Sequence, residues 1–169
     1  MATIPTINDL RGLPDPLLQY KWTLIVPNVP GGGDGRRFQY QCKTSSIPGL
    51  SVEEALVTSH GIDLQYMGRQ MYGQSFSATF FETRDLYVYT MFRNWLDLGR
   101  NHREGTGNYK SGYATKAQML LLDDTNKVIK TVNLEGFFPS ELSEASVDGS
   151  SSSPVEFNVT FKFDVSYLS

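Results

Sequence analysis

Apolar and polar residues alternate with a period of two over several segments of the chain, which is typical of β-strands that bury one face. The segments with this pattern are residues 20–26, 38–43, 74–82, 116–122, 128–138 and 155–167. In the last segment every second residue is apolar from end to end, which predicts one uninterrupted strand. Residues 123–126, Asp-Asp-Thr-Asn, form a turn between the fourth and fifth segments. The pattern predicts a mainly β, antiparallel fold.

Two hairpins are expected from the turns. The first two strands are separated by the glycine-rich residues 31–35, and the simplest pairing joins these strands as a hairpin. Residues 51–71 alternate weakly on either side of His60 and Gly61, which predicts a long hairpin with its tip there. Because this second hairpin lacks a continuous apolar face, it is marginal in isolation. We therefore expect residues 51–71 to be an oligomerisation hairpin that contacts another subunit.

One segment, residues 84–100, has the helical period instead. Its apolar residues, which share one side of a helix, are Val88, Met91, Phe92, Trp95 and Leu98. Thr83 or Asp85 is expected to cap the N-terminus, and Gly99 to take the left-handed position at the C-terminus. This is the one helix that the pattern predicts, and residues 101–112 are expected to form an exposed loop.

Composition and charge fit one soluble globular domain, residues 1–169, with no shift that marks a boundary. The 169 residues are 40% apolar and 20% charged, and the formal charge is −3, which disfavours tight binding of nucleic acid. Residues 1–18 are expected to form an extended N-terminal arm. Neither a signal peptide nor a run of about 20 apolar residues, as a membrane span requires, is visible.

Candidate chemistry is sparse. Cys42 is the only cysteine and lies in a strand-like run, so we expect it to pack and to form no intrachain disulfide. His60 and His102 are the only histidine bases, and both are expected at solvated loop positions. The sequence therefore predicts no catalytic residue and no enzyme.

No metal or cofactor site is predicted either. Asp123 and Asp124 stand in a turn and lack the alternating acidic ligands of a calcium loop. Residues 31–33, Gly-Gly-Gly, precede no Lys-Ser/Thr pair and are expected to lead into a strand, so a phosphate-binding loop is disfavoured.

A mild basic cluster accompanies the helix and the loop that follows it. Its members are Arg84, Arg93, Arg100, Arg103, Lys110 and Lys116. Two interpretations remain open: a solvated helix face, and a docking surface for an acidic protein partner.

Several segments, in their order along the chain, resemble the tail tube proteins of contractile-tailed bacteriophages. They are residues 38–43 leading to Ile47-Pro48-Gly49, the weakly patterned hairpin, the aromatic helix around residues 92–95, and the closing strands 132–138 and 155–167. The resemblance covers the chain from about residue 20 onward and rests on the order of these segments. Residues 1–18 and 31–35 have no counterpart in the family pattern and are candidates for docking on a sheath or a baseplate ring.

The resemblance implies an antiparallel β-sandwich or barrel with one flanking α-helix. It implies further that hexameric rings stack into a tube, and that the inner strands of neighbouring subunits join into one continuous barrel. Double-stranded DNA then passes through the channel when the sheath contracts. Implied partners are other copies of the chain, the tail sheath protein, and the baseplate and tail terminator proteins, without a membrane. The implied location is the tail of the virion, after assembly in the cytoplasm of the host bacterium.

Three groups of residues are assigned on this basis. The expected inter-subunit interface consists of Pro48, Gly49, Leu50, Val52, Val57, Ile62, Leu64 and Tyr66. Candidates for the lumen are the acidic residues Glu53, Glu54, Asp63 and Glu135. Candidates for docking the sheath are Arg93, Arg100 and Arg103.

Two alternatives stay open at this stage. The same segments fit a tube-initiating baseplate protein or the inner tube of a related contractile injection system, such as type VI secretion. A monomeric β-barrel that binds a ligand in an internal apolar cavity is the alternative from a different class.

Overall fold

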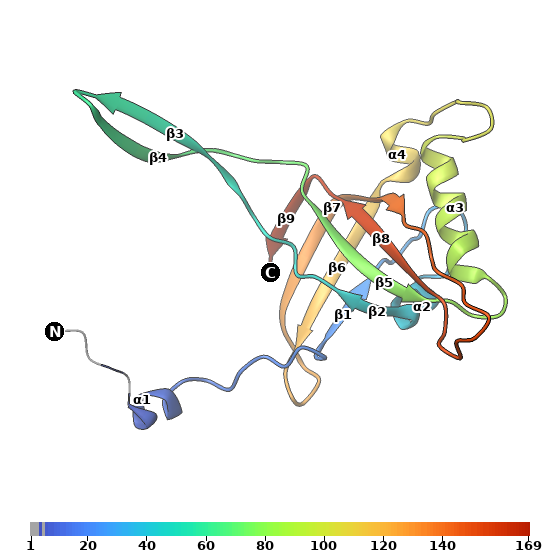
Figure 1. Cartoon of the computed structure of the whole chain (residues 1–169), viewed down its shortest axis with the longest axis horizontal. Coiled ribbons are helices and arrows are strands. Elements are labelled where there is room, and N and C mark those ends of the chain that lie inside the picture. The colour runs from blue at the N-terminus through green and yellow to red at the C-terminus, as the bar shows by residue number, and fades with distance from the viewer. Residues whose placement is uncertain (1–3, 5) are drawn as a thin grey trace.

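A computed structural model describes residues 4 and 6–169, and it confirms a mainly β, antiparallel fold (Figure 1). The strands are β1 (Trp22–Ile25), β2 (Cys42–Ser45), β3 (Val52–Ser59), β4 (Ile62–Gln70), β5 (Ser75–Phe81), β6 (Thr115–Leu122), β7 (Val128–Leu142), β8 (Glu156–Lys162) and β9 (Val165–Leu168). The helices in the described chain are α1 (Ile7–Arg11), α2 (Gly35–Gln41), α3 (Tyr87–Gly99) and α4 (Lys110–Tyr113). The prediction of a single helix is therefore incomplete, because α1, α2 and α4 have too few turns to show a helical period.

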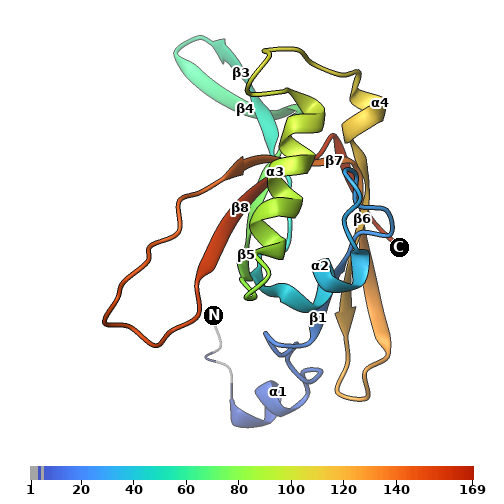
Figure 2. The ribbon, with the colours of Figure 1, turned by 90° about the vertical axis from the view of Figure 1, so that its right-hand side faces the viewer.

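Seven strands form one bent sheet in the order β1-β6-β7-β8-β5-β2, with β9 also paired to β7. The long strand β7 changes partners along its length. Residues 128–137 pair with β6 and partly with β9, and residues 138–142 pair with β8. The sheet therefore folds into two layers, and α3 lies in front of the opening between them (Figure 2).

Aromatic side chains fill the space between these layers and α3. The largest fully buried side chains are Trp95, Phe38, Phe80, Phe92, Phe137 and Phe161. Phe161 stacks on Phe137 with ring centroids 4.6 Å apart, and Phe92 of α3 lies 5.0 Å from Phe80. Because most of these rings meet edge to face, this packing adds to the burial of their apolar area. The predicted core faces of β5 and of the helix are confirmed.

The predicted strand over residues 38–43 is wrong, and so is its hairpin with the first strand. Residues 35–41 form α2 instead, and only β2 follows, which pairs with β5, while β1 pairs with β6. The Asp34 side chain caps α2 by accepting a hydrogen bond from the Arg36 N–H at 2.9 Å. Phe38 and Gln41, one helical turn apart, are the residues that α2 buries. In such a short segment, the alternation of apolar and polar residues could not distinguish a strand from two turns of helix.

The uninterrupted strand predicted for residues 155–167 is also interrupted. It breaks after Lys162, so that β8 pairs with β5 and β7, and β9 pairs with β7 alone. Phe161 and Phe163 are buried as predicted, whereas Tyr167 is exposed. The Asp164 N–H donates to the Glu135 carbonyl at 2.9 Å, which holds the bend against β7.

The helix α3 is confirmed, but both predicted ends are wrong. Leu86 occupies the N-cap position with a left-handed φ of 52° and no side-chain cap. The carboxylate of Glu82 serves the free N–H groups instead, accepting from Val88 at 3.0 Å and Tyr89 at 2.8 Å. At the other end Arg100, at a φ of −150°, follows Gly99 in an extended conformation. No left-handed glycine ends this fully described helix.

Leu86→Gly is expected to stabilise the protein. A left-handed conformation costs a residue with a Cβ atom roughly 1–2 kcal/mol, and glycine avoids that cost. The Leu86 side chain is 52% exposed, so its removal loses little packing. Urea unfolding should give a gain of about 1 kcal/mol. Leu86→Ala is the matched control: it removes the side chain beyond Cβ but keeps the Cβ atom, so a similar gain there would contradict the role of the backbone.

Arg37 ties α2 to the start of α3. Its guanidinium donates to both carboxylate oxygens of Asp85, at 2.8 and 3.1 Å, and lies 3.7 Å from the centre of the Tyr87 ring. The hydrogen bonds from Arg37, and then from Thr83, lower the pKa of Asp85 to about 2. The expected N-cap residues Thr83 and Asp85 are thus engaged by Arg37 rather than by the helix.

This ion pair predicts a pH dependence of stability. The pKa of an aspartate in the unfolded chain is about 3.9, so the lowered folded value means that the ionised form favours folding. Its contribution is fully present above about pH 4 and is lost as the pH falls towards 2. The difference in melting temperature between wild type and Asp85→Asn should therefore be constant at neutral pH and vanish in acid. A difference that persists unchanged below the folded pKa would contradict this assignment.

Candidate assembly interface

The hairpin of β3 and β4 is a separate two-stranded sheet that projects away from the rest of the protein (Figure 1). Its tip is a two-residue turn in which His60 and Gly61 both have positive φ, 54° and 76°. That combination matches a type I′ turn, which suits the twist of a hairpin. The hairpin and its tip therefore lie where the sequence predicted them.

The register of the hairpin sorts its side chains onto two faces. Directly paired residues share a face, and successive residues alternate. One face, here called the apolar face, contains Ala55 opposite Tyr66, Val57 opposite Leu64 and Ser59 opposite Ile62. The other, the polar face, contains Glu54 opposite Met67, Leu56 opposite Gln65 and Thr58 opposite Asp63. The weak alternation of the sequence thus becomes a distinct apolar stripe once the strands pair.

The apolar face has no cover within its own subunit. Val57, Leu64, Tyr66 and Ile62 are 49%, 48%, 56% and 63% exposed. Four such side chains side by side, on a hairpin that has no core of its own, form a surface that fits another protein. These are four of the eight residues expected at the interface.

The other four expected interface residues lie at the root of the hairpin. Val52 is the first residue of β3, and Leu50 is exposed just before it. Pro48 and Gly49 belong to the connection from β2; Pro48 is half-buried and Gly49 is exposed. The eight residues therefore lie in two groups, four at the root of the hairpin and four towards its tip, and their role in assembly stays a prediction.

The four acidic candidates for the lumen separate in space. Glu54 and Asp63 lie on the polar face, where Asp63 accepts a hydrogen bond from Thr58 at 2.7 Å. Glu53 forms an ion pair with Arg69 across the hairpin. Glu135 is remote from them, on β7, where Lys116 of β6 pairs with it at 3.2 Å.

The basic candidates lie around α3 and the loop that follows it. Arg93 donates to the Tyr89 hydroxyl at 3.3 Å one turn earlier, and Arg100 follows the last residue of the helix. Arg103 is exposed in the loop. Nearby, His102 pairs with Asp97 at 2.6 Å, and this hydrogen bond lowers the pKa of Asp97. The loop also contains α4, which the sequence did not predict.

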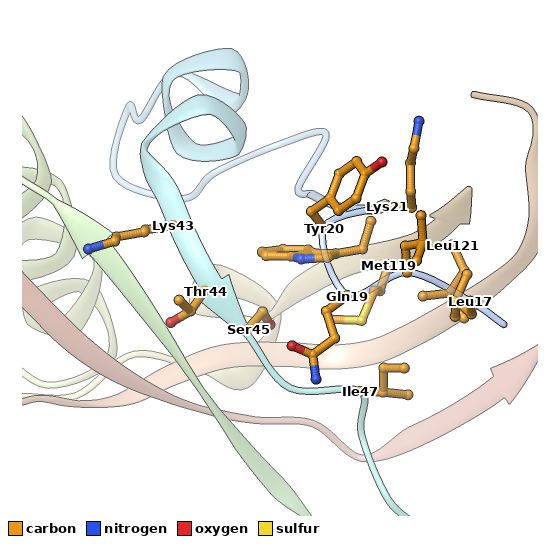
Figure 3. Close-up of a pocket in the computed structure, with 12 residues that line it drawn as sticks. Leu17, Gln19, Tyr20, Lys21, Lys43, Thr44, Ser45, Ile47, Met119 and Leu121 are labelled. Atoms are coloured by element: carbon orange, nitrogen blue, oxygen red, sulfur yellow. The ribbon is translucent and has the colours of Figure 1, made fainter. Parts of the chain in front are cut away.

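An apolar groove of about 610 Å³ lies between the two edge strands and the end of the N-terminal arm (Figure 3). Trp22 of β1, Thr44 of β2 and Met119 of β6 line it, and the arm contributes Leu17 and Tyr20. The sequence did not reveal this groove, because its walls come from three separate segments. The described part of the arm continues outward to α1, which buries no residue; the predicted arm residues 1–3 and 5 lie outside the described residues.

The residues that could carry chemistry lie in four separate places, Cys42 against the core, Asp123 in a turn, and His60 and His102 at exposed positions. Cys42 packs against the core, and burial raises the pKa of its thiol to about 12. His60 is exposed at the hairpin tip and His102 is exposed in its loop. The Asp123 carboxylate accepts from the N–H groups of Thr125 and Lys127, each at 2.8 Å, so it serves the turn as predicted.

The glycine run differs from its prediction, because residues 31–33 do lead into a helix, α2. Asp34 already occupies the N-terminus of that helix. Among residues 4 and 6–169, no three His, Cys, Asp or Glu side chains are grouped to hold a metal ion. In the same part of the chain, no helix combines the length and the apolar character needed to cross a membrane.

Among solved structures, chains of contractile injection systems share this fold. One is in the PVC sheath-tube complex in its extended state, with a TM-score of 0.66, 14% identity and 99% of both chains covered. The cap of the anti-feeding prophage matches with a TM-score of 0.69 and 12% identity, over 94% of this chain and 93% of that one. Its baseplate contains a match with a TM-score of 0.67 and 14% identity, over 93% and 97%.

The sequence itself identifies the family. Residues 22–168 match the phage tail tube protein family, and the chain belongs to it. The resemblance inferred from the order of segments is thus confirmed. No curated protein matches the sequence.

Proposed function

We propose that this protein is the structural subunit of a contractile phage tail tube. Hexameric rings stack into a tube, and DNA is delivered through its channel when the surrounding sheath contracts. The role is structural and includes no catalysis. The observation that carries the proposal is the uncovered apolar face of the β3–β4 hairpin, since membership of the tail tube family gives this face an obvious partner, another copy of the chain.

The proposed interface runs from Pro48 to Tyr66 and places the hairpin against a neighbouring subunit. Burying its four central apolar side chains, now about half exposed, would contribute roughly 1 kcal/mol each. Repeated around a ring and along a tube, such contributions add up. The acidic residues Glu53, Glu54 and Asp63 are then candidates for the channel side, where negative charge would not bind the phosphates of DNA.

A second candidate within the same class is a tube-initiating baseplate protein or the inner tube of a related injection system. The likeness to chains in the anti-feeding prophage baseplate and the PVC sheath-tube complex favours it. A monomeric ligand-binding barrel is not favoured, because phenylalanine side chains fill the interior and the apolar groove lies outside it, between the edge strands.

Electron microscopy of the purified protein tests the proposal directly. Rings and channelled tubes are expected at high concentration, and single isolated particles at every concentration would contradict it. Long tubes favour a main tube protein, whereas rings that never elongate favour an initiator. Mass spectrometry of purified virions then tests the location in the tail, and cell fractionation tests assembly in the host cytoplasm.

The proposed partners are the sheath, baseplate and tail terminator proteins. Arg93, Arg100 and Arg103 suit docking of an acidic sheath surface, because all three are exposed. The helix α3 and the loop that follows it lie on the other side of the main sheet from the hairpin (Figure 1).

Arg93→Glu combined with Arg103→Glu is expected to weaken co-sedimentation of tubes with purified sheath by about an order of magnitude at low salt, because charge complementarity is reversed. Lys127→Glu combined with Lys130→Glu makes the same total charge change at two exposed positions around the start of β7, away from α3, and should leave binding unchanged. Equal losses in both variants would point to a general charge effect and contradict a specific docking surface.

A further inference from the structure

The middle of one face of the sheet formed by β2, β5 and β8 consists of short hydroxyl and amide side chains, with Phe81 opposite Glu156 at one end and Ser75 opposite Lys162 at the other. In register across the strands, Ser77 lies opposite Thr160, Thr79 opposite Asn158, and Thr44 of β2 opposite Thr79. Their neighbours along the strands point the other way into the phenylalanine core. Ser77 and Asn158 are exposed, so this hydroxyl face is open to solvent in the isolated subunit.

The helices that contact this sheet lie on its other side. Phe38 of α2 and Phe92 of α3 both contact Phe80 and Phe161, which belong to the buried face. The hydroxyl face is therefore left uncovered by α2 and α3.

Exposed apolar side chains are absent from this face and common elsewhere. Within β2, β5 and β8, all of whose residues are described, no large apolar side chain is exposed. By contrast, the N-terminal arm, the hairpin and β9 each expose several, Tyr167 and Leu168 of β9 among them. Surfaces of that kind suit protein contacts, whereas the hydroxyl face suits contact with water.

Charge on the face is low. Lys43 forms an ion pair with Glu156, which leaves Lys162 as the one charged side chain of these three fully described strands without an ion-pair partner. Proteins that hold DNA tightly neutralise its phosphates with several lysines and arginines. A face with one isolated lysine and a layer of hydroxyls has no such cluster.

The position of the face also links it to the hairpin. β2 leads into β3, and β4 leads into β5, so the sheet that bears the hydroxyl face is the one from which the hairpin emerges. β2 is an edge strand whose outer side pairs with no strand of the described chain. A neighbouring copy that pairs with this edge would continue the same sheet and the same face around a ring.

We propose that the hydroxyl face of β2, β5 and β8 is the wall of the tube channel, over which duplex DNA passes without being held by ion pairs. This inference rests on the proposed tube function and identifies which surface of the subunit lines the channel. It assigns the wall to Thr44, Ser77, Thr79, Asn158 and Thr160, and leaves Glu135 on the opposite layer.

Thiol labelling of assembled tubes tests the wall assignment. In a Cys42→Ser background, Ser77→Cys and Asn158→Cys place a thiol on the hydroxyl face, and Thr90→Cys places one on exposed α3. Tubes are treated with N-ethylmaleimide or with maleimide attached to a large globular protein that cannot enter the channel. We expect the two wall thiols to react with the small reagent and to be protected from the large one by about an order of magnitude, whereas the α3 thiol reacts with both.

The outcomes separate the two proposals. If no variant and no wild-type protein forms tubes, the tube function itself fails. If tubes form and the wall thiols react equally with both reagents, the face lies outside the channel and the wall assignment alone fails. Protection from both reagents would place the face in a subunit interface and would also overturn the assignment.

A charge substitution tests passage of DNA over this wall. Tubes of Asn158→Lys are expected to retain a fluorescent DNA duplex at low salt and to release it as salt rises. Tubes of Asn158→Gln, with a similar side-chain length and no charge, should not retain it. Equal retention by the two variants, or strong retention by wild-type tubes, would overturn the proposed role.

Discussion

Replacing residues 52–70 with a short glycine-serine linker should abolish tube assembly while leaving the subunit folded. The hairpin is a separate sheet, and its root is already closed, because the Met71 N–H donates to the Ser51 carbonyl at 3.1 Å. The linker therefore joins two ends that lie within hydrogen-bond distance. Electron microscopy should show no tubes, and circular dichroism should show a β-rich protein with a melting temperature close to that of wild type.

A matched pair of point variants tests whether the apolar face of the hairpin itself contacts the neighbouring subunit. Leu64→Asp puts a charge on the apolar face, where burial against a neighbour would desolvate it, and should block assembly. Gln65→Asp introduces the same negative charge one residue away, on the polar face, and this variant should assemble normally. Tubes formed equally well by both variants would contradict the proposed interface.

Gly136→Ala is expected to destabilise the fold by about 2–4 kcal/mol, the sum of a left-handed alanine and a steric clash. Gly136 has a φ of 66°, and an added Cβ atom would overlap the Asp164 carboxylate, with the Asp164 Cγ only 2.6 Å away. Asp164 cannot move aside freely, because Lys110 pairs with its side chain and Glu135 binds its N–H. The midpoint of urea unfolding measures the loss.

Gly149→Ala is the control for the same chemical change. Gly149 has no atom within 4 Å of an added Cβ and no positive φ, so its unfolding free energy should shift by no more than about 0.5 kcal/mol. If Gly136→Ala were equally neutral, the crowding between β7 and the bend at Asp164 would not be a real constraint.

The period identified the buried faces of two long segments correctly, but it did not show the break after Lys162 in residues 155–167, and it misassigned the short segment 38–43. Strand β5 and helix α3 each repeat their pattern often enough to define a buried face. Residues 35–41 complete only two helical turns, so Phe38 and Tyr40 suggested an alternation that the structure does not have. The predicted N-terminal cap of α3 was wrong for a different reason. The carboxylate that accepts hydrogen bonds from the first N–H groups of the helix belongs to Glu82, which precedes the expected cap residues.

The candidate interface could also be predicted only in part, because its faces depend on how distant residues pair. The sequence located the hairpin and its tip, because His60 and Gly61 interrupt two weak alternations. It did not reveal which residues share a face, since that depends on the pairing register. Val57 and Leu64 become neighbours only when the strands pair. The hydroxyl face was equally hidden, because Ser77 and Thr160 are far apart along the chain and meet only across β5 and β8.

A hairpin without its own core has a consequence for the time course of assembly. Its strands are held by backbone hydrogen bonds with exposed side chains, so they open more easily than the main sheet, and their amides should exchange hydrogen quickly in the free subunit. A growing end of the proposed tube would offer the ordered surface that this segment lacks in the free subunit. Free subunits of the proposed tube would therefore add readily to an existing end and start new tubes slowly.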